Sequence, residues 1–370
     1  MNKKILISCY EVPGYGGAST SGYDLFRMLK DTNLDVCYLN IIYEKDVDYY
    51  KLLYGDNFGN PLDLPKVYNY ILKGSWQTPQ PGLLNLLEEL TPDINLNIGS
   101  PAAFLMSNMD KKAKSIFLTA GCSIVKEAVA KKMIFDSVTL SKLIEKPMYE
   151  VIPDDILEKK AVEKSELVIT HSYMIRDFFR YFYWQYDHKI YSDVMWFADW
   201  IYKSAQDYSN LQKPFSKREI DLLFLVSSWS RPDKNYDYVE KIVTRLKNLS
   251  IHIVGEIDKR ICNEVNHGFI TDRKELFSLL GNSKVIVSPS LFDPAPGILY
   301  EASALGCNIV TSKNSGNWQI CNSRLLVEDF CLECYIEKIN LAIKKRYDDN
   351  IDFFLNFKSF DNLVDILSVL

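Results

Sequence analysis

Two acids, Asp293 and Glu301, stand eight positions apart on either side of a turn rich in proline and glycine. An apolar, β-branched run at 285–287 precedes the turn, and Ile298 to Leu305 after it has helical spacing and ends before Gly306. This order predicts a buried parallel strand, a loop that faces ligand, and a helix. Acids in such a loop can accept hydrogen bonds from the hydroxyl groups of a ligand.

The start of the predicted helix is suited to an anion. The first backbone N–H groups of a helix have no partner within it, and the helix dipole favours negative charge there. We expect the N–H groups of Gly297, Ile298 and Leu299 to hold a phosphate in this turn, and we count Pro296 among the residues that bind the same ligand. Glu301 and Asp293 would then hold hydroxyl groups of the same ligand from two sides. The alternative is an ordinary buried strand, turn and helix with incidental acids.

A second candidate is Lys234, in the turn between a predicted strand at 220–226 and a predicted helix at 235–247. A cation at the start of a helix opposes the helix dipole unless an anion is bound there. Lys234 therefore predicts an anion site, and a surface lysine is the alternative.

A glycine-rich loop, Glu11 to Thr20, follows the first predicted strand, Lys4 to Tyr10. It has the place of the opening turn of a doubly wound domain, where ligands collect at the carboxyl ends of the strands. Gly16 and Gly17 let a ligand approach the backbone closely, but the loop lacks the dinucleotide-binding glycine spacing. A plain tight turn is an equally good interpretation.

Residues 288–317 resemble the donor-binding signature of retaining GT-B glycosyltransferases, in particular glycosyltransferase family 4, the glycosyl transferases group 1. The positions that match in register are Pro289, Ser290, Gly297, Glu301, Ala302, Ala304 and Gly306. The first acid of the signature is Asp293 here and not glutamate, and Ala295-Pro296 replaces the usual Pro-Phe. The shorter acid implies a different donor sugar or a different placement of it.

The resemblance also assigns roles to other residues. The family has a lysine at the place of Lys234 that binds the donor diphosphate, usually with an arginine six positions earlier. That position is Ser228 here, and Arg231 replaces the arginine if the loop turns it inward. Gly268 and Phe269 are assigned to the donor site, and Gly16 and Gly17 to the donor phosphates or the acceptor.

The fold that the resemblance implies is α/β, with two facing Rossmann-like domains of parallel strands. We assign residues 1–205 to an acceptor-binding domain, 206–350 to a sugar-nucleotide-binding domain, and 351–370 to a C-terminal helix that crosses back to the first domain. The polar, turn-rich stretch 204–219 reads as the linker, and Ser359 to Leu370 as an amphipathic helix.

The reaction implied is transfer of a sugar from a nucleotide-diphosphate sugar, UDP- or GDP-linked, with retention of configuration and without metal or cofactor. The acceptor would be a glycan, a lipid-linked sugar or a small molecule, as in polysaccharide biosynthesis. Lys234, Arg231 and Asp293 are the catalytic candidates in a front-face transfer. A sugar-nucleotide epimerase of the same fold and a non-catalytic sugar- or nucleotide-binding protein remain alternatives.

Many family members place a histidine after the strand predicted here at 116–119, but Ala120 to Ser123 follows it in this chain. This absence puts a histidine-assisted step in doubt. His171, after the strand predicted at 167–169, is expected to be structural.

Composition excludes other classes of protein. The chain has 370 residues, which suggests about two domains, and its net charge of −5 gives no reason to expect nucleic acid. Because no segment approaches the roughly 18 apolar residues of a membrane span, we predict a cytoplasmic protein. Residues 111–150 hold eight lysines against four acids, which suggests either peripheral contact with a membrane or a solvated helix face.

Three further features were assigned from the sequence. The eight cysteines are scattered through apolar runs, as reduced core thiols are, and we interpret Cys331 and Cys334 as a chance pair on a helix. The dense aromatics at 178–202 either line an acceptor cleft or pack the core. Residues 44–80 are rich in tyrosine, and no function is assigned to them.

Overall fold

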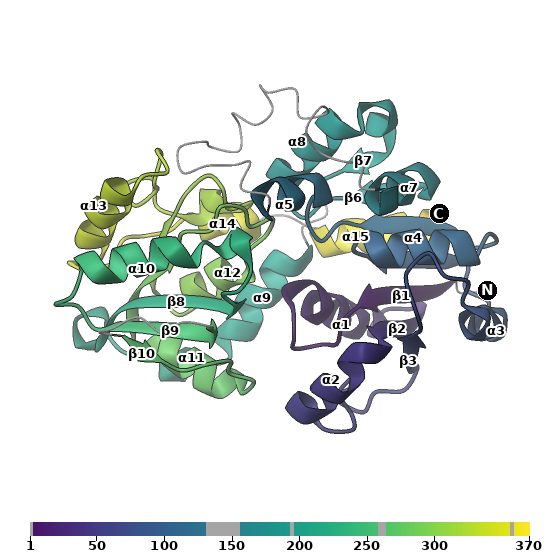
Figure 1. Cartoon of the computed structure of the whole chain (residues 1–370), viewed down its shortest axis with the longest axis horizontal. Helices are drawn as coiled ribbons and strands as arrows, with labels where there is room; N and C mark the ends of the chain where they lie inside the picture. Colours follow the sequence, from purple (N-terminus) through teal and green to yellow (C-terminus); the bar gives the residue numbers. More distant parts are fainter. Residues whose placement is uncertain (1–2, 131–155, 193–195, 258–263, 356–358) are drawn as a thin grey trace. The chain divides into compact units, whose positions relative to one another are not determined.

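The structure is a computed structural model, and it describes residues 3–130, 156–192, 196–257, 264–355 and 359–370 (Figure 1). The chain forms two compact units. The first unit comprises residues 1–123, 154–195 and 359–370, and the second comprises 124–153 and 196–358.

The first unit is built on a parallel sheet with the order β3-β2-β1-β4-β5-β6-β7. Its strands are β1 (Lys4–Tyr10), β2 (Asp35–Tyr43), β3 (Val67–Leu72), β4 (Ile94–Ile98), β5 (Lys114–Leu118), β6 (Leu167–Ile169) and β7 (Ile190–Tyr191). The strand order reverses between β1 and β4, and ligands of doubly wound sheets bind at the carboxyl ends of the strands at such a point.

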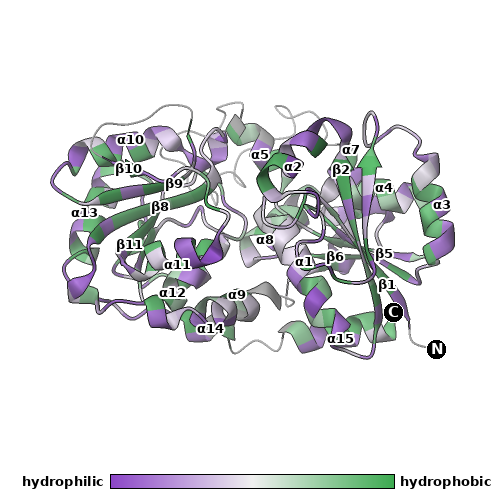
Figure 2. Cartoon of the chain, turned by 90° about the horizontal axis from the view of Figure 1, so that it is seen from below, coloured by the Kyte–Doolittle hydropathy of each residue, from purple (hydrophilic) through white to green (hydrophobic). Residues whose placement is uncertain are grey.

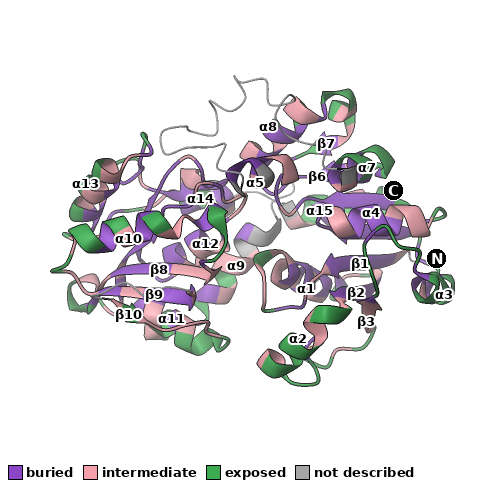
Figure 3. Cartoon of the chain, in the orientation of Figure 1, coloured by how far each residue is buried: buried purple, intermediate pink, exposed green. Residues whose placement is uncertain are grey.

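Helices follow most of these strands, as parallel connections require. They are α1 (Gly17–Lys30), α2 (Val47–Tyr54), α3 (Pro81–Leu90), α4 (Ser100–Met109), α7 (Ile156–Lys164), α8 (Tyr173–Phe182) and α15 (Ser359–Val369), with short 3-10 turns at Glu44–Asp46 and Trp184–Lys189. Figure 3 shows β1 buried and α2 largely exposed.

The C-terminal helix α15 packs on the first unit. Its apolar face buries Leu363 and Leu367 completely. Lys3 Nζ donates to Ser368 O at 2.6 Å, and Lys114 Nζ donates to the carbonyl oxygen of Leu370 at 2.5 Å. The helix therefore completes the unit to which the first strand belongs.

The second unit has a parallel sheet with the order β10-β9-β8-β11-β12. Its strands are β8 (Ile220–Ser228), β9 (Ile251–Glu256), β10 (Val265–Asn266), β11 (Ser283–Ser288) and β12 (Asn308–Thr311). β8 carries an apolar run, as expected for a strand covered on both faces, and Figure 2 shows this run as hydrophobic. The order reverses between β8 and β11.

The helices of the second unit are α9 (Trp196–Gln206), α10 (Tyr236–Arg245), α11 (Arg273–Gly281), α12 (Gly297–Ala304), α13 (Leu332–Ala342) and α14 (Ile351–Leu355). Short 3-10 turns lie at Ser209–Leu211, Phe215–Lys217, Pro232–Lys234 and Trp318–Ile320. Helix α5 (Ser123–Ala130) begins at the boundary between the units.

The units divide at 195/196, whereas the sequence suggested 205/206. The difference is helix α9, which packs against α12 of the second unit. A Cβ atom on Gly297 would lie only 3.2 Å from Ile201 Cδ1, so the two helices approach closely at this point. Residues 351–358 also group with the second unit, and 359–370 with the first.

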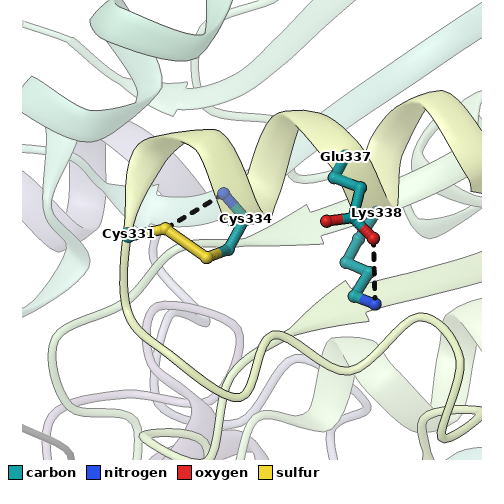
Figure 4. Close-up of a disulfide and its surroundings, with 4 residues drawn as sticks. All are labelled: Cys331, Cys334, Glu337 and Lys338. Carbon is teal, nitrogen blue, oxygen red and sulfur yellow. Dashed lines mark hydrogen bonds and ion pairs between the residues drawn. A yellow bond between two sulfur atoms is a disulfide. The ribbon is translucent and has the colours of Figure 1, made fainter.

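Cys331 and Cys334 are joined by a disulfide, and the interpretation of this pair as chance thiols was wrong (Figure 4). Cys331 is the N-cap of α13, and its sulfur accepts a hydrogen bond from Cys334 N–H at 3.1 Å. One helical turn brings the two Cα atoms to 5.3 Å, which lies within the range that a disulfide spans. The other cysteines that the structure describes are buried and lie outside this disulfide: Cys9, Cys37, Cys122, Cys307 and Cys321.

Candidate active site

The carboxyl edge of the second sheet brings Lys234 and Asp293 together. Lys234 lies in the loop after β8 and Asp293 in the loop after β11, the two strands between which the strand order reverses. Lys234 Nζ and Asp293 Oδ2 are 2.6 Å apart, and their side chains are only 8% and 14% exposed. The two residues that the sequence singled out on separate grounds thus form one nearly buried ion pair.

Further hydrogen bonds fix the two loops to each other. Asn235 Nδ2 donates to Pro289 O at 3.0 Å, and Leu291 N–H donates to Asp233 O at 2.9 Å. The backbone of Asp293 is held from its other side, because its N–H donates to Asn314 O at 3.0 Å and its carbonyl accepts from Gly316 N–H at 2.7 Å. The ion pair is therefore built on a rigid frame.

The position of Lys234 modifies the argument from the helix dipole. Lys234 ends a 3-10 turn, and Asn235, in the left-handed conformation with φ 59°, is the N-cap residue of α10. The anion that offsets the unfavourable position of this cation is the carboxylate of Asp293. A bound phosphate is consequently not required to explain why a lysine is tolerated there.

Arg231 belongs to the same cluster through Asp233. Its Nη2 lies 2.6 Å from Asp233 Oδ2 and its Nε lies 3.3 Å from Asp233 Oδ1. Asp233 Oδ2 is in turn 3.9 Å from Lys234 Nζ. The Arg231 side chain remains 44% exposed, so the guanidinium group is accessible while Asp233 holds it beside the lysine.

Ser228 stands at the end of β8, where the sequence has a serine in place of the family's arginine. Its hydroxyl lies 2.8 Å from the hydroxyl of Ser230. Ser228 therefore contributes a hydroxyl to the edge that carries Lys234, and no charge.

Helix α12 begins at Gly297, with Pro296 as its N-cap residue. Leu299 N–H donates to Pro296 O at 3.2 Å, so the donors left for a phosphate in this turn are at most those of Gly297 and Ile298. Two of the expected backbone donors are thus compatible with anion binding, and the third is engaged.

Glu301, also on α12, is 15% exposed and faces a cation that the sequence did not suggest. Arg273 Nη2 lies 3.8 Å from Glu301 Oε1. Arg273 is the first residue of α11, after the N-cap Asp272. The dipole argument applied to Lys234 would have indicated Arg273 as well, since it is a cation in the first turn of a helix.

Gly268 lies beside the same edge of the sheet. Gly255, at the end of β9, donates its N–H to Gly268 O at 2.8 Å. Gly268 itself has a φ of +66°, which favours glycine, and Phe269 follows it directly. The two residues thus lie at the end of the strand next to β8.

Gly16 and Gly17 belong to the first unit, at the start of α1. A Cβ atom added to Gly16 would lie only 2.6 Å from a carboxylate oxygen of Glu11. The space beside Gly16 therefore holds a negative charge of the protein itself.

A histidine does lie at the carboxyl edge of the first sheet. His171 follows β6, and its Nδ1 is 3.2 Å from the hydroxyl of Thr119 at the end of β5. His171 is 8% exposed, which is consistent with the structural role expected for it.

Only some of the described aromatics at 178–202 pack in the core. Phe178 and Phe179 are buried on α8, and Phe179 packs on Phe117 of β5 with ring centroids 6.0 Å apart. Trp184 and Tyr191 are exposed instead, at 69% and 46%. The side chains of Trp196 and Phe197 lie outside the described residues.

Neither a metal cluster nor a membrane span is found in the described residues. Within them, no three side chains of His, Cys, Asp or Glu form a group that could hold a metal ion. None of the described helices is both long and apolar enough to cross a membrane. Of the lysine-rich region, Lys111, Lys112 and Lys114 are exposed, whereas Lys131, Lys132, Lys142 and Lys146 lie outside the described residues.

Residues 220–344, which contain every member of the charged cluster and Glu301, match the family model for glycosyl transferases group 1. The match covers less than half of the chain, and within these residues it confirms the resemblance noted in the sequence. No curated protein sequence matches the chain.

Solved structures show the same fold over the whole chain. HepE from Anabaena, in complex with UDP and glucose, aligns over 100% of both chains with a TM-score of 0.62 and 15% identity. WaaG, a glycosyltransferase involved in lipopolysaccharide biosynthesis, covers 98% of this chain and 99% of its own, with a TM-score of 0.62 and 15% identity.

An enzyme of a different reaction class is also similar. The UDP-GlcNAc 2-epimerase from Methanocaldococcus jannaschii covers 99% of this chain and 100% of its own, with a TM-score of 0.56 and 15% identity. At these identities the similarities establish the GT-B fold, with its two Rossmann-like units, and not the reaction.

Proposed function

We propose that this protein is a glycosyltransferase that moves a sugar from a nucleotide-diphosphate sugar to a carbohydrate or lipid-linked acceptor, with retention of configuration. The second unit binds the donor, and the first unit binds the acceptor. The observation that carries the proposal is the Lys234–Asp293 ion pair, which lies inside the family match and at the point where the strand order of the second sheet reverses.

The donor diphosphate is the group that this edge suits. Lys234 has three N–H donors and uses one toward Asp293, so it can donate to a phosphate oxygen while its position is fixed. Arg231 adds a partly exposed guanidinium group. The first N–H groups of α12, which follows the loop that carries Asp293, are further donors for a phosphate. Fixed donors of this kind stabilise charge that develops on a leaving group.

The proposed reaction is a front-face transfer. The bond between the anomeric carbon and the diphosphate oxygen breaks, and its electron pair stays on the diphosphate, where Lys234 and Arg231 stabilise it. The acceptor oxygen bonds to the same face of the anomeric carbon, and its proton passes to the departing phosphate. No metal ion is required for this step.

UDP-sugars are the first donors to test, since HepE was solved with UDP and glucose. Thermal shifts with a panel of UDP-, GDP-, dTDP- and CDP-sugars rank the donors, because a ligand that binds only the folded state raises the melting temperature. We expect one base to stand out, and we expect Lys234→Ala to lose that preference.

Epimerisation of a sugar nucleotide is the second candidate, because an epimerase is among the similar structures. The two functions differ in what becomes of the donor. A transferase releases nucleoside diphosphate and forms a glycoside, whereas a 2-epimerase returns an isomeric sugar nucleotide. Chromatography of a reaction with and without an acceptor distinguishes them.

Contact with a membrane surface is a lesser proposal for the lysine-rich region. Lys111, Lys112 and Lys114 are exposed in the first unit, which is the unit proposed to bind the acceptor. Sedimentation with vesicles of anionic lipid tests it, with vesicles of neutral lipid as the control.

A further inference from the structure

A cavity of about 370 Å³ opens in the first unit, beside the carboxyl ends of β1 and β2. It adjoins the reversal of strand order, since Tyr10 and Glu11 follow β1 and Pro101 follows β4. Its size falls within the range of small-molecule sites. Six aromatic rings line it: Tyr10, Tyr15, Tyr43, Tyr49, Tyr50 and Trp76.

The aromatic rings hold one another in place. Tyr15 of the glycine-rich loop meets Tyr49 and Tyr50 of α2 edge to face, with centroids 5.8 and 5.2 Å away. Tyr43 meets Trp76 in the same way at 5.3 Å. Rings fixed before binding lose little freedom when a ligand stacks on them.

Gly99 makes room for Tyr10, the ring nearest the reversal point. A Cβ atom on Gly99 would lie 2.4 Å from Tyr10 Cε1, and the φ of Gly99 is +84°. A glycine is therefore required at the start of α4 for Tyr10 to line the cavity.

The charges at the cavity disfavour an anion. Glu11 and Asp46 supply two carboxylates. The one lysine among the lining residues, Lys45, places its Nζ 5.2 Å from the centroid of Tyr43. An anionic ligand would therefore meet more negative than positive charge.

Glu11 also has a strained backbone. Its φ is +66°, a conformation that costs a residue other than glycine free energy and is concentrated at functional sites. Burial, and after it the negative charge of Glu11, raises the pKa of Tyr50, so the Tyr50 hydroxyl remains protonated and able to donate. The carboxylate beside Gly16 favours a hydroxyl-bearing ligand at the glycine-rich loop over a phosphate.

We propose that this cavity binds an uncharged saccharide ring of the acceptor. A pyranose has a face of C–H groups, which suits the negative face of an aromatic ring, and an edge of hydroxyl groups, which suits carboxylates. The first unit then selects a neutral sugar over a sugar phosphate or a uronic acid. This inference rests on the proposed function in one respect, namely that the bound saccharide is the acceptor of the transfer reaction. Its test measures binding and does not depend on transfer.

Saturation-transfer NMR on the full chain without donor tests the inference. The probes are methyl glycosides of neutral hexoses and, as a pair that differs mainly in charge, methyl glucuronoside and its methyl ester. Irradiation of the protein's aromatic protons should transfer saturation to the ring C–H groups of a neutral probe. The ester should bind at least about tenfold more tightly than the free acid, a factor that corresponds to about 1.4 kcal/mol.

Variants locate the binding to the cavity. Tyr49→Ala removes a partly exposed ring, so the variant should fold, and it should weaken binding of the neutral probes by about tenfold. Trp184→Ala removes an exposed aromatic elsewhere in the same unit and should change nothing. Glu11→Gln should reduce the preference for the ester over the acid.

The inference is overturned if no saccharide receives saturation, if Tyr49→Ala and Trp184→Ala behave alike, or if the acid binds better than its ester. Nucleotide release from a UDP-sugar separates this failure from that of the proposed function. Donor turnover without saccharide binding at the cavity refutes the inference alone. Saccharide binding without any donor turnover refutes the proposed function and leaves the cavity as a sugar-binding site.

Discussion

Lys234 Nζ lies 2.6 Å from Asp293 Oδ2, and this ion pair links the loop after β8 to the loop after β11. The residues are 59 positions apart in the chain and meet because β8 and β11 are neighbours in the sheet. Both side chains are nearly buried, so each depends on the other for the compensation of its charge. The pair therefore has a structural role in addition to the role proposed toward the donor.

Removing either partner should destabilise the chain. Lys234→Met and Asp293→Asn should each lower the free energy of unfolding by about 3 kcal/mol, because the remaining charge is left buried and unpaired. The double variant should lose less than the sum of the two, with a coupling of about 1 to 3 kcal/mol. Denaturant unfolding measures all four proteins, and strictly additive losses would mean that the two side chains do not interact.

Turnover should depend on Lys234 beyond its effect on stability. Under conditions where the variant is folded, Lys234→Ala should lower kcat by about a hundredfold and raise KM less, because charge on the diphosphate grows toward the transition state. Lys284 and Asp221 form a control pair in the same unit, 2.7 Å apart and partly buried. Lys284→Ala should affect stability and leave kcat unchanged, and an effect confined to KM in Lys234→Ala would limit Lys234 to binding.

Glu301→Gln should weaken donor binding by about tenfold, which is the loss of one charge-assisted hydrogen bond. The fold should persist, since the partner Arg273 is 43% exposed and is not left buried without a counter-ion. Calorimetry with the preferred sugar nucleotide measures the change. An affinity equal to that of the parent would remove Glu301 from the donor site.

Stability should fall below neutral pH because of His252 and His267. The two rings lie 2.9 Å apart, from Nδ1 of one to Nε2 of the other. Burial lowers the pKa of both histidines. The charge of His267 lowers the pKa of His252 further, whereas the carboxylate of Glu275 acts to raise the pKa of His267. In the unfolded chain a histidine has its ordinary pKa of about 6.5. The unfolded chain therefore binds more protons than the folded chain as the pH falls.

This contribution to stability is therefore complete above about pH 6.5 and is lost as the pH falls toward the lowered values of the folded state. Melting temperatures from pH 7.5 to 5 should decline less steeply for His267→Gln than for the parent. His188→Gln, which alters an exposed ring, is the control. Equal slopes for the parent and His267→Gln would exclude the pair as the cause.

The strands of both sheets that lie away from the edges could be predicted from the sequence. Lys4–Tyr10 and Leu167–Ile169 were assigned with the bounds that the structure has, because strands buried on both faces read as short apolar runs. The edge strands β3 and β7 were missed. Val67–Leu72 is only half buried and mixes tyrosine and asparagine with apolar residues, and β7 has two residues.

The candidate site could be predicted residue by residue but not as an arrangement. The spacing around Asp293 and the place of Lys234 before a helix identified both residues. Their contact depends on strand order, which no local pattern contains. The cavity of the first unit was missed for the same reason, since its aromatic rings come from three separate segments: Tyr10 and Tyr15, Tyr43 to Tyr50, and Trp76.

The most direct test of the central claim is the fate of the sugar in a reaction of the protein with its preferred sugar nucleotide and a neutral glycoside acceptor. Proton NMR follows the nucleoside diphosphate, the anomeric proton of the product and any isomer of the donor. We predict one nucleoside diphosphate per glycoside formed, with the anomeric configuration of the donor retained. An inverted glycoside would contradict the front-face mechanism, and an isomerised sugar nucleotide with the acceptor unchanged would contradict the assignment as a transferase.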